Sequence, residues 1–132
     1  MKYMVQIFGG RDTWDEEMAA YAKAKAGWGP LVSFMEEVNK ELAERGEMVE
    51  AQGLGGPGPV TTVRARPDGT PEVTDGPHFR AEKILAGYWI IDVATPERAV
   101  EIATRISTAP RPDGTPGDDP VELHPVMEGP PE

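Results

Sequence analysis

The sequence predicts an α+β domain in which an antiparallel sheet carries its helices on one face. Three observations support this fold class. The segments with strand and helix patterns alternate as strand, helix, helix, strand, hairpin, strand, helix, strand. An apolar content of 39% over 132 residues is enough for one small core. Turns rich in glycine and proline separate the segments. We therefore interpret residues 1–132 as one domain, with an acidic, Pro/Gly-rich tail from about residue 109. A large multidomain enzyme is excluded.

Residues 1–46 are predicted to form one strand and two helices. Residues 2–8 are rich in β-branched and aromatic side chains and stop at a Gly-Gly pair, which predicts a central strand. Thr13 and Glu16 have the spacing of a capping box that starts a first helix. Pro30 suits the first turn of a second helix, and Gly46 follows its end. The apolar stripes of the two helices are Trp14, Met18 and Tyr21, and Leu31, Phe34, Met35, Val38 and Leu42.

The rest of the chain is predicted to contain four more strands and one helix. Alternation of polar and apolar residues over 47–54 indicates a half-buried strand. Residues 60–65 and 71–74 flank Asp68-Gly69 and are expected to pair as a hairpin. The remaining elements are a strong strand over 86–93, a helix from Thr95-Pro96 to about Ser107, and a short strand over 121–126.

The hexapeptide Arg-Pro-Asp-Gly-Thr-Pro occurs at 66–71 and again at 111–116. A duplicated unit could explain the two copies. Turn chemistry explains them more simply, because proline followed by Asp-Gly favours a chain reversal wherever one is needed. We therefore expect two similar turns rather than two similar domains.

The charge balance argues against two classes of partner. Thirteen basic and twenty-three acidic residues leave a formal charge of −10, which repels nucleic acid and anionic lipid. The absence of cysteine excludes disulfides, thiolate nucleophiles and cysteine metal sites. No segment has the pattern of a signal peptide or a membrane span, so we expect a cytoplasmic protein.

Strand alternation predicts that one face of the sheet needs a cover. The face packed against the helices is expected to carry Tyr3, Val5, Ile7, Trp89, Ile91 and Val93. The opposite face then carries Met4, Gln6, Phe8, Tyr88, Ile90 and Asp92. Since Met4, Phe8 and Ile90 make this face too apolar to lie in water, we expect a second copy of the chain to cover it in a homodimer.

The same face gathers polar side chains that could line a pocket for a small molecule. These residues are Gln6, Glu50, Gln52, Tyr88, Asp92, Glu122 and His124, and the loop 74–79 could lie over them. Apolar walls with a few polar groups are typical of small-molecule sites. Each of these residues taken singly could equally face solvent or the rim of a dimer.

Asp75 and His78 are the best candidates for acid–base chemistry. A carboxylate can orient an imidazole as a general base, and Tyr88 or Gln6 could donate to a developing oxyanion. The alternative is that Asp75 forms a turn with its own backbone and that His78 packs in a loop. We expect no metal and no cofactor, because two histidines 46 positions apart match no metal-binding spacing.

Two other chemistries are disfavoured. The Gly-rich segment 53–58 lacks the Lys-Ser/Thr ending of a phosphate loop, and Pro57 and Pro59 remove backbone donors. The two serines, Ser33 and Ser107, lie on or at the end of predicted helices, and no Gly-x-Ser-x-Gly elbow occurs.

Val73-Thr74-Asp75-Gly76-Pro77, followed by Ala86-Gly87-Tyr88-Trp89-Ile90-Ile91, resembles the YCII-related, or DGPF-type, domain family. The start at 1–4, the segments 51–54 and 95–106 and the ending 121–128 are similar to that family in the same order. The resemblance implies a ferredoxin-like fold that pairs into a dimeric α+β barrel. It also implies, for some members, a His-Asp pair in small-molecule chemistry and, for others, association with extracytoplasmic-function sigma factors.

The chain departs from the family pattern at two places. His78 stands where the family motif has Phe, with Phe79 one place later, and Glu82-Lys83 reverses the usual Lys-Glu order. Only Asp75 and the Gly76-Pro77 turn therefore carry over from the motif. We interpret the chain as a homodimer that binds a small organic ligand between sheet and partner, with acid–base catalysis as an added hypothesis. The alternative is a non-catalytic module whose acidic surface and tail, residues 113–132, contact a basic regulatory protein.

Overall fold

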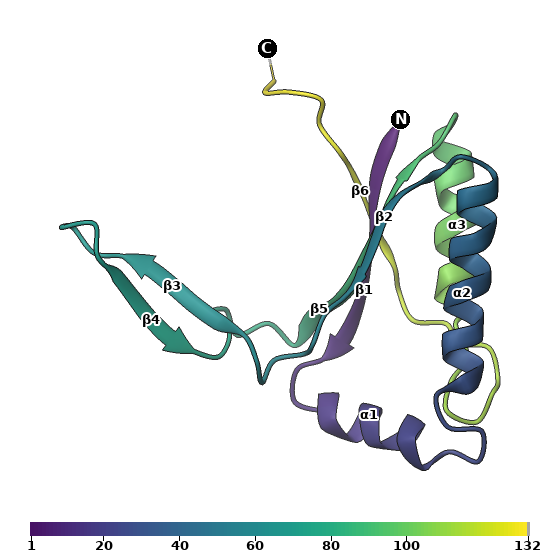
Figure 1. Ribbon diagram of the computed structural model, residues 1–132, viewed down its shortest axis with the longest axis horizontal. Helices are drawn as coiled ribbons and strands as arrows, with labels where there is room; N and C mark the ends of the chain where they lie inside the picture. Colours follow the sequence, from purple (N-terminus) through teal and green to yellow (C-terminus); the bar gives the residue numbers. More distant parts are fainter. Residues whose placement is uncertain (132) are drawn as a thin grey trace.

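A computed structural model describes residues 1–131 and contains a four-stranded antiparallel sheet. Its strands lie in the order β2 (Met48–Gly53), β5 (Lys83–Asp92), β1 (Lys2–Gly10) and β6 (Glu122–Pro125). Two long helices, α2 (Gly29–Glu44) and α3 (Pro96–Ser107), cover one face, and the shorter α1 (Trp14–Lys23) lies across one end of that layer (Figure 1). This is the α+β arrangement that the order of elements predicts, with the ferredoxin-like form that the family resemblance implies. None of the helices within residues 1–131 is both long enough and apolar enough to cross a membrane.

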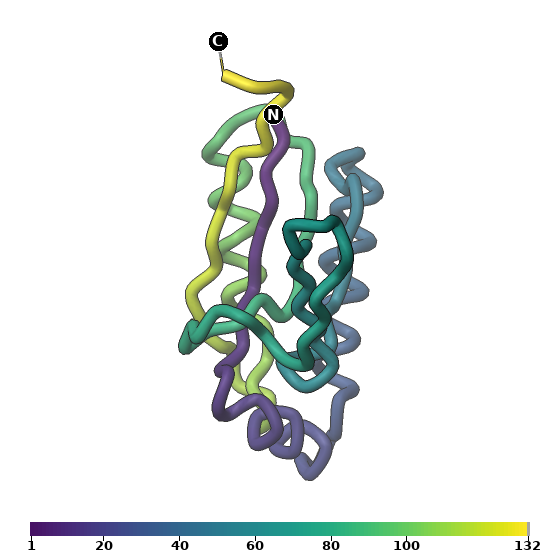
Figure 2. Tube along the Cα trace, turned by 90° about the vertical axis from the view of Figure 1, so that its left-hand side faces the viewer, coloured from purple at the N-terminus to yellow at the C-terminus, as the bar shows by residue number. Residues whose placement is uncertain are grey.

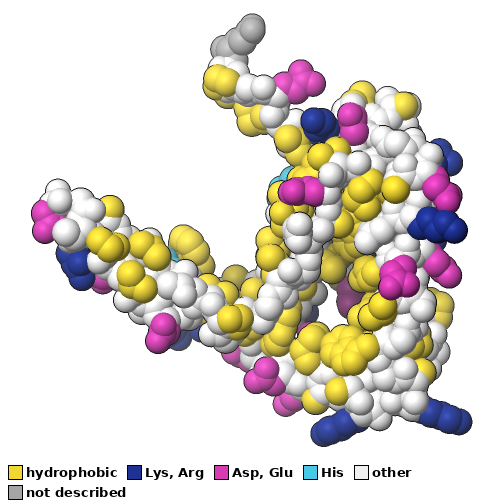
Figure 3. All heavy atoms as spheres, viewed as in Figure 1, with side chains coloured by type: hydrophobic (Ala, Val, Ile, Leu, Met, Phe, Trp, Pro, Cys, Tyr) yellow, Lys and Arg dark blue, Asp and Glu magenta, His cyan; other side chains and the backbone are white. Residues whose placement is uncertain are grey.

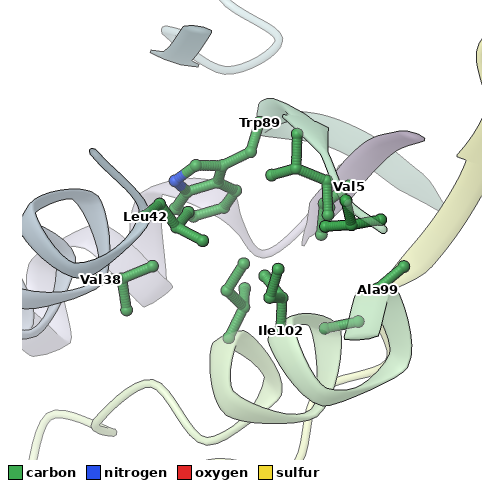
Figure 4. Packing of buried hydrophobic residues seen from close by; sticks show 10 residues of the cluster. Val5, Val38, Leu42, Trp89, Ala99 and Ile102 are labelled. Atoms are coloured by element: carbon green, nitrogen blue, oxygen red, sulfur yellow. The ribbon is translucent and has the colours of Figure 1, made fainter. Parts of the chain in front are cut away.

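The core lies between the sheet and the two long helices (Figure 4). Val5 and Ile91 are fully buried on the helix side of the sheet, as the alternation predicts. Trp89 lies beside them, and its indole nitrogen donates a hydrogen bond to Asn39 Oδ1 of α2 at 2.8 Å. The helices contribute Val38, Leu42, Ala99, Ile102, Ala103 and Ile106. Burial of these side chains is the main source of stability that this architecture offers.

The pairing of β1 with β5 contains one irregularity. The register between β1 and β5 is irregular between Ile7 and Phe8. Both residues border the same cavity on the helix side of the molecule. The residue skipped by this register is Ala86 of β5, so the two-residue alternation of β1 is not interrupted there, and Ile7 packs against the core as predicted. That Phe8 lies on the face of Met4 and Gln6 stays a prediction.

The helix ends match two of the three predicted starts. Thr95 has extended backbone angles and accepts a hydrogen bond from the Arg98 N–H at 3.1 Å, as expected of an N-cap before Pro96. Pro30 lies in the first turn of α2, and Gly46, with φ 70°, follows its end.

The capping box predicted from Thr13 and Glu16 is absent. Thr13 has φ −113° and ψ 6° and makes no side-chain cap. Its hydroxyl instead donates to Glu17 Oε1 at 2.8 Å. An N-cap residue needs extended backbone to aim its oxygen at the free N–H groups of the first turn, and Thr13 lacks that conformation.

The two Arg-Pro-Asp-Gly-Thr-Pro copies form the same turn. In each, the aspartate accepts from the threonine N–H two residues later, at 3.0 Å for Asp68 and 2.9 Å for Asp113. Gly69 and Gly114 both have φ 86°. The arginines also match, since each donates from Nη1 to the carbonyl of the last proline at 2.6 Å. One copy closes a hairpin and the other lies in the loop after α3, so local turn chemistry accounts for the repeat.

The predicted hairpin is present as a separate ribbon, which we call the arm. It consists of β3 (Thr61–Ala65) and β4 (Pro71–Asp75), which pair with each other and not with the four-stranded sheet. The arm projects from the sheet on the side opposite the helices (Figure 1) and stands in front of the sheet when that side is viewed directly (Figure 2). Val63 and Val73, which face each other in the arm, are each 61% exposed.

A buried ion pair joins α3 to the start of β2. Glu47 is buried, and the guanidinium of Arg98 donates to both of its carboxylate oxygens at 2.9 Å. Arg45 adds a hydrogen bond at 3.0 Å. These donors, chiefly Arg98, lower the pKa of Glu47. No sequence pattern marks the pair, because the two residues are 51 positions apart.

Candidate functional site

The face of the sheet opposite the helices, here called the open face, carries the polar residues predicted to line a pocket. The register aligns Gln52, Tyr88 and Gln6 in one row across β2, β5 and β1. The next row contains Glu50, Ile90 and Met4, and it ends at His124 in β6. Glu122 lies opposite Gln6. These strands lie side by side because β1 and β5 pair along nearly their whole length.

Most of these polar groups contact one another. The Tyr88 hydroxyl donates to Glu50 Oε1 at 2.9 Å, and this hydrogen bond raises the pKa of Tyr88. Gln6 Nε2 donates to the Met4 sulfur at 3.2 Å, a weak acceptor. His124 Nε2 lies 2.8 Å from Glu122 Oε1. The face therefore offers amide and hydroxyl groups beside apolar side chains, with the Glu50 carboxylate bound to Tyr88 and one imidazole–carboxylate pair at its β6 edge.

Asp92 lies at one end of the open face. Its carboxylate forms an ion pair with the amino group of Met1 at 3.1 Å. The register pairs Asp92 with Lys2, two positions beyond the row of Met4 and Ile90. Asp92 therefore lies on the predicted face, but its carboxylate is paired with the amino group of Met1.

Asp75, Gly76 and Pro77 form a turn at the base of the arm. Gly76 has φ 89°, its N–H donates to the Val60 carbonyl at 2.7 Å, and its own carbonyl accepts from Thr62 Oγ1 at 2.7 Å. A left-handed conformation at this position favours glycine. The motif that carries the family resemblance thus closes the arm and sets its direction.

The two candidate catalytic residues are not hydrogen-bonded to each other. Among the hydrogen bonds of residues 1–131, none joins Asp75 to His78. Asp75 borders a shallow hollow with Arg11 and Asp15, where β1 leads into α1. His78 is exposed, with its ring edge-on to Phe79 at a centroid distance of 4.9 Å. The Asp75-Gly76-Pro77 turn therefore lies at the end of the sheet where β1 leads into α1.

Arg11 is a neighbour of Asp75 that the sequence reasoning missed. Its backbone N–H donates to the Glu82 carbonyl at 2.9 Å, which holds the end of β1 against the strand after the Asp-Gly-Pro turn. The only local signal is its position after a Gly-Gly pair. Within residues 1–131, no group of three or more His, Asp or Glu side chains is arranged to hold a metal ion.

Comparison with known proteins supports a family assignment and nothing finer. No curated protein matches this chain closely enough to lend it a substrate or a reaction. The YCII-related domain matches residues 10–114, a span that includes the three helices, the arm and the strands β2 and β5 of the sheet. The protein therefore belongs to the YCII-related domain family.

Proposed function

We propose that this protein is a homodimer that binds a small organic molecule on the open face of its sheet, in a cleft closed by the second copy. The observation that carries the proposal is the composition of this face. Met4 and Ile90 lie between polar groups that face the same way, and no element of residues 1–131 packs over them as the helices pack over the other side. An uncovered sheet face of this kind calls for a partner surface.

The arm supports a second copy as that partner. Hydrophobic side chains follow the arm and the side of the sheet that it faces, and a wide notch separates the two (Figure 3). Val63, Val73 and Phe79 are more than half exposed, at 61%, 61% and 81%. In a two-fold symmetric pair, each arm would lie against the other copy and bury these side chains.

The polar row then supplies the ligand contacts. Gln6, Gln52 and Tyr88 offer amide and hydroxyl groups that match a neutral or hydrogen-bonding organic molecule. Asp92 and His124 would contribute from the ends and the edge of the same face. Because the Tyr88 hydroxyl already donates to Glu50, a ligand carbonyl would have to compete with that carboxylate.

The dimer is tested with two single-charge variants, one on the open face of the sheet and one on the outer surface of the helix layer. Ile90→Asp puts a carboxylate on the open face. Val100→Asp puts one on α3, at a side chain that is 56% exposed. Light scattering after size-exclusion chromatography should give a dimer for the wild type and for Val100→Asp and a monomer for Ile90→Asp. A monomeric wild type would overturn the proposal.

Ligand binding is tested by native mass spectrometry of gently purified protein. We expect the dimer to retain an additional small mass. Tyr88→Phe should reduce its occupancy, and Tyr3→Phe, on the helix side of the same sheet, should not. Loss of the mass in both variants or in neither would argue against binding at the open face.

We add the hypothesis that Asp75 and His78 carry out acid–base chemistry on the molecule bound by the dimer. The test is chemical: the wild type should convert the retained molecule on incubation, and His78→Ala should return it unchanged. Equal conversion by both proteins would exclude this role for His78.

A second candidate is a module that binds a basic regulatory protein. The observation that favours it is the tail, in which six acids and no Lys or Arg follow Arg111. Of these acids, Asp118 forms an ion pair with Arg111 at 2.6 Å. A variant in which all six acids are replaced by their amides and which still captures a basic partner would count against this candidate.

A further inference from the structure

A cavity of about 360 Å³ lies on the helix side of the molecule, away from the open face. It is bounded by α1, the first half of α2, the end of α3 and the loop that follows α3. Its walls are largely apolar, with Met18 from α1, Leu31 and Met35 from α2, and Ile106 from α3. This volume is within the range of pockets that hold small organic ligands.

The cavity has a fixed frame because α1 is held at both ends. At its start, Trp14 is buried and lies directly against Gly56 and Gly9. At its end, the Tyr21 hydroxyl donates to the Pro110 carbonyl at 2.8 Å, and the Tyr21 ring stacks on Trp28 at 4.9 Å. Met18 lies between these two anchors and over the gap. The anchors prevent α1 from collapsing into the space without loss of both contacts.

The polar groups around the cavity have an excess of negative charge. Arg111 is the one basic residue of the lining, and it is occupied by the Pro116 carbonyl and by Asp118, each at 2.6 Å. Glu17 and Asp119 also line the cavity. The Glu17 carboxylate accepts from the Thr13 hydroxyl at 2.8 Å. Asp119 accepts from the Ser107 hydroxyl through its backbone carbonyl, not through its carboxylate.

The pKa of Tyr21, which lies near these acidic groups, reflects the same negative potential. Burial raises the pKa of Tyr21, and the charges of Asp119 and Glu17 raise it further, against a smaller opposing effect of Arg111. A negative potential at the cavity wall disfavours an anionic guest and favours a cationic one.

We propose that this cavity is a binding site for a small organic cation with an apolar body, such as an arylalkyl amine. The apolar body packs against Met18, Leu31 and Met35. The ammonium group lies at the polar wall beside Glu17 and Asp119, where its charge is complementary and its N–H groups find carboxylate acceptors. This site is separate from the open face, so it does not depend on the function proposed above.

The charge preference is tested with three probes of one shape: 3-phenylpropylamine, 3-phenylpropanol and 3-phenylpropionate. Isothermal titration with the full chain should show saturable binding of the amine, at least about tenfold tighter than that of the propionate. The alcohol should lie between them. Equal affinities, or no saturable binding of the amine, would overturn the proposal.

The position of the cation is tested with matched charge variants. Glu17→Gln with Asp119→Asn removes two charges from the cavity, whereas Glu16→Gln with Glu97→Gln removes two exposed charges that do not line it. The first pair should reduce the preference for the amine to less than about threefold, and the second pair should leave it unchanged. Equal loss in both pairs would mean that the overall charge of −10 attracts the amine, and it would overturn the site.

The position of the apolar body is tested with neighbouring residues of α2. Leu31→Trp fills the cavity and should abolish binding, whereas Val32→Trp adds the same side chain at an exposed position outside it. Retained binding in Leu31→Trp, with a native circular dichroism spectrum, would overturn the proposal. If Leu31→Trp does not fold, the charge variants decide the question.

Discussion

Glu47 shows how a single buried charge depends on the groups around it. The side chain lies between the end of α2 and the start of β2, and two arginines satisfy its carboxylate. Arg98 also donates to Glu101 of its own helix at 3.1 Å, so one guanidinium serves both the buried carboxylate of Glu47 and an exposed one. Removing one partner of such a pair leaves the other buried without compensation, which costs more than the pair gains in net stability.

Glu47→Gln is expected to lower the free energy of unfolding by about 2 kcal/mol at neutral pH, because Arg98 loses its charged acceptor. The folded-state pKa of Glu47 is lower than the ordinary value, so its contribution is present above the ordinary glutamate pKa. It is lost as the pH falls through the lowered folded value. Urea unfolding at several pH values should therefore show the two proteins converging in acid.

The control for this prediction is Glu44→Gln. Glu44 is exposed and lies 3.9 Å from Lys40, a surface pair that contributes little. Its substitution should change stability by less than about 0.5 kcal/mol. An equal effect at both positions, or a Glu47 effect that persists in acid, would contradict the assigned role of the buried carboxylate.

Gly56 illustrates a packing constraint within the glycine-rich loop. It has φ 82°, and a Cβ at this position would overlap the indole ring of Trp14. Gly56→Ala should therefore destabilise the protein by about 1–3 kcal/mol and change the near-ultraviolet circular dichroism of the tryptophans. Gly58→Ala, where a Cβ meets nothing within 4 Å, should leave both unchanged. Tolerance of alanine at Gly56 would mean that Trp14 is not held by this loop.

At the scale of elements, the arm differs from the rest of the fold. The four-stranded sheet and helices share one core, whereas β3 and β4 bond to each other and contribute no residue to that core. The hydrogen bonds of Gly76, to Val60 and from Thr62, close the base of the arm and do not reach the sheet. A two-stranded ribbon has little stability of its own in water, so an exposed arm is best explained by contact with another surface.

Val63→Thr with Val73→Thr makes the arm polar without changing the shape of its side chains. The wild-type dimer proposed above should dissociate at a concentration at least about tenfold lower than the variant dimer. Each protein should keep the same far-ultraviolet spectrum, because these valines lie outside the core. Sedimentation equilibrium measures the dissociation constants, and identical values would exclude the arm from the dimer contact.

At the scale of the whole molecule, the fold is a two-layer structure with one covered and one uncovered sheet face. The helices bury one side of β1 and β5, and the other side keeps Met4 and Ile90 half-buried beside a polar row. The formal charge of −10 opposes nonspecific association, so a specific apolar contact is needed for two copies to meet.

Dimerisation should make thermal stability depend on concentration, because a partner that binds only the folded chain shifts the unfolding equilibrium. The wild-type midpoint measured by calorimetry should rise over a 100-fold increase in protein concentration. The midpoint of Ile90→Asp should be constant over the same range. A constant wild-type midpoint would contradict the dimer at this scale.

Local sequence patterns determined most of the elements of this protein. The alternation that places Val5 and Ile91 on the helix side, the N-cap at Thr95 and the two Asp-Gly turns all depend on residues a few positions apart. Such interactions form within one segment, so the sequence alone specifies them. Thr13 was mispredicted because its backbone conformation, which spacing does not report, decides whether it can cap.

Tertiary structure decided which of the predicted side chains meet. Gln6, Tyr88 and Gln52 share a row because β5 pairs with both β1 and β2, whereas Asp75 lies by Arg11 at the end of the sheet. The Glu47–Arg98 pair, the direction of the arm and the cavity under α1 have no local signature. They arise from the packing of segments far apart in the chain, and the free energy of that packing is not contained in any single segment.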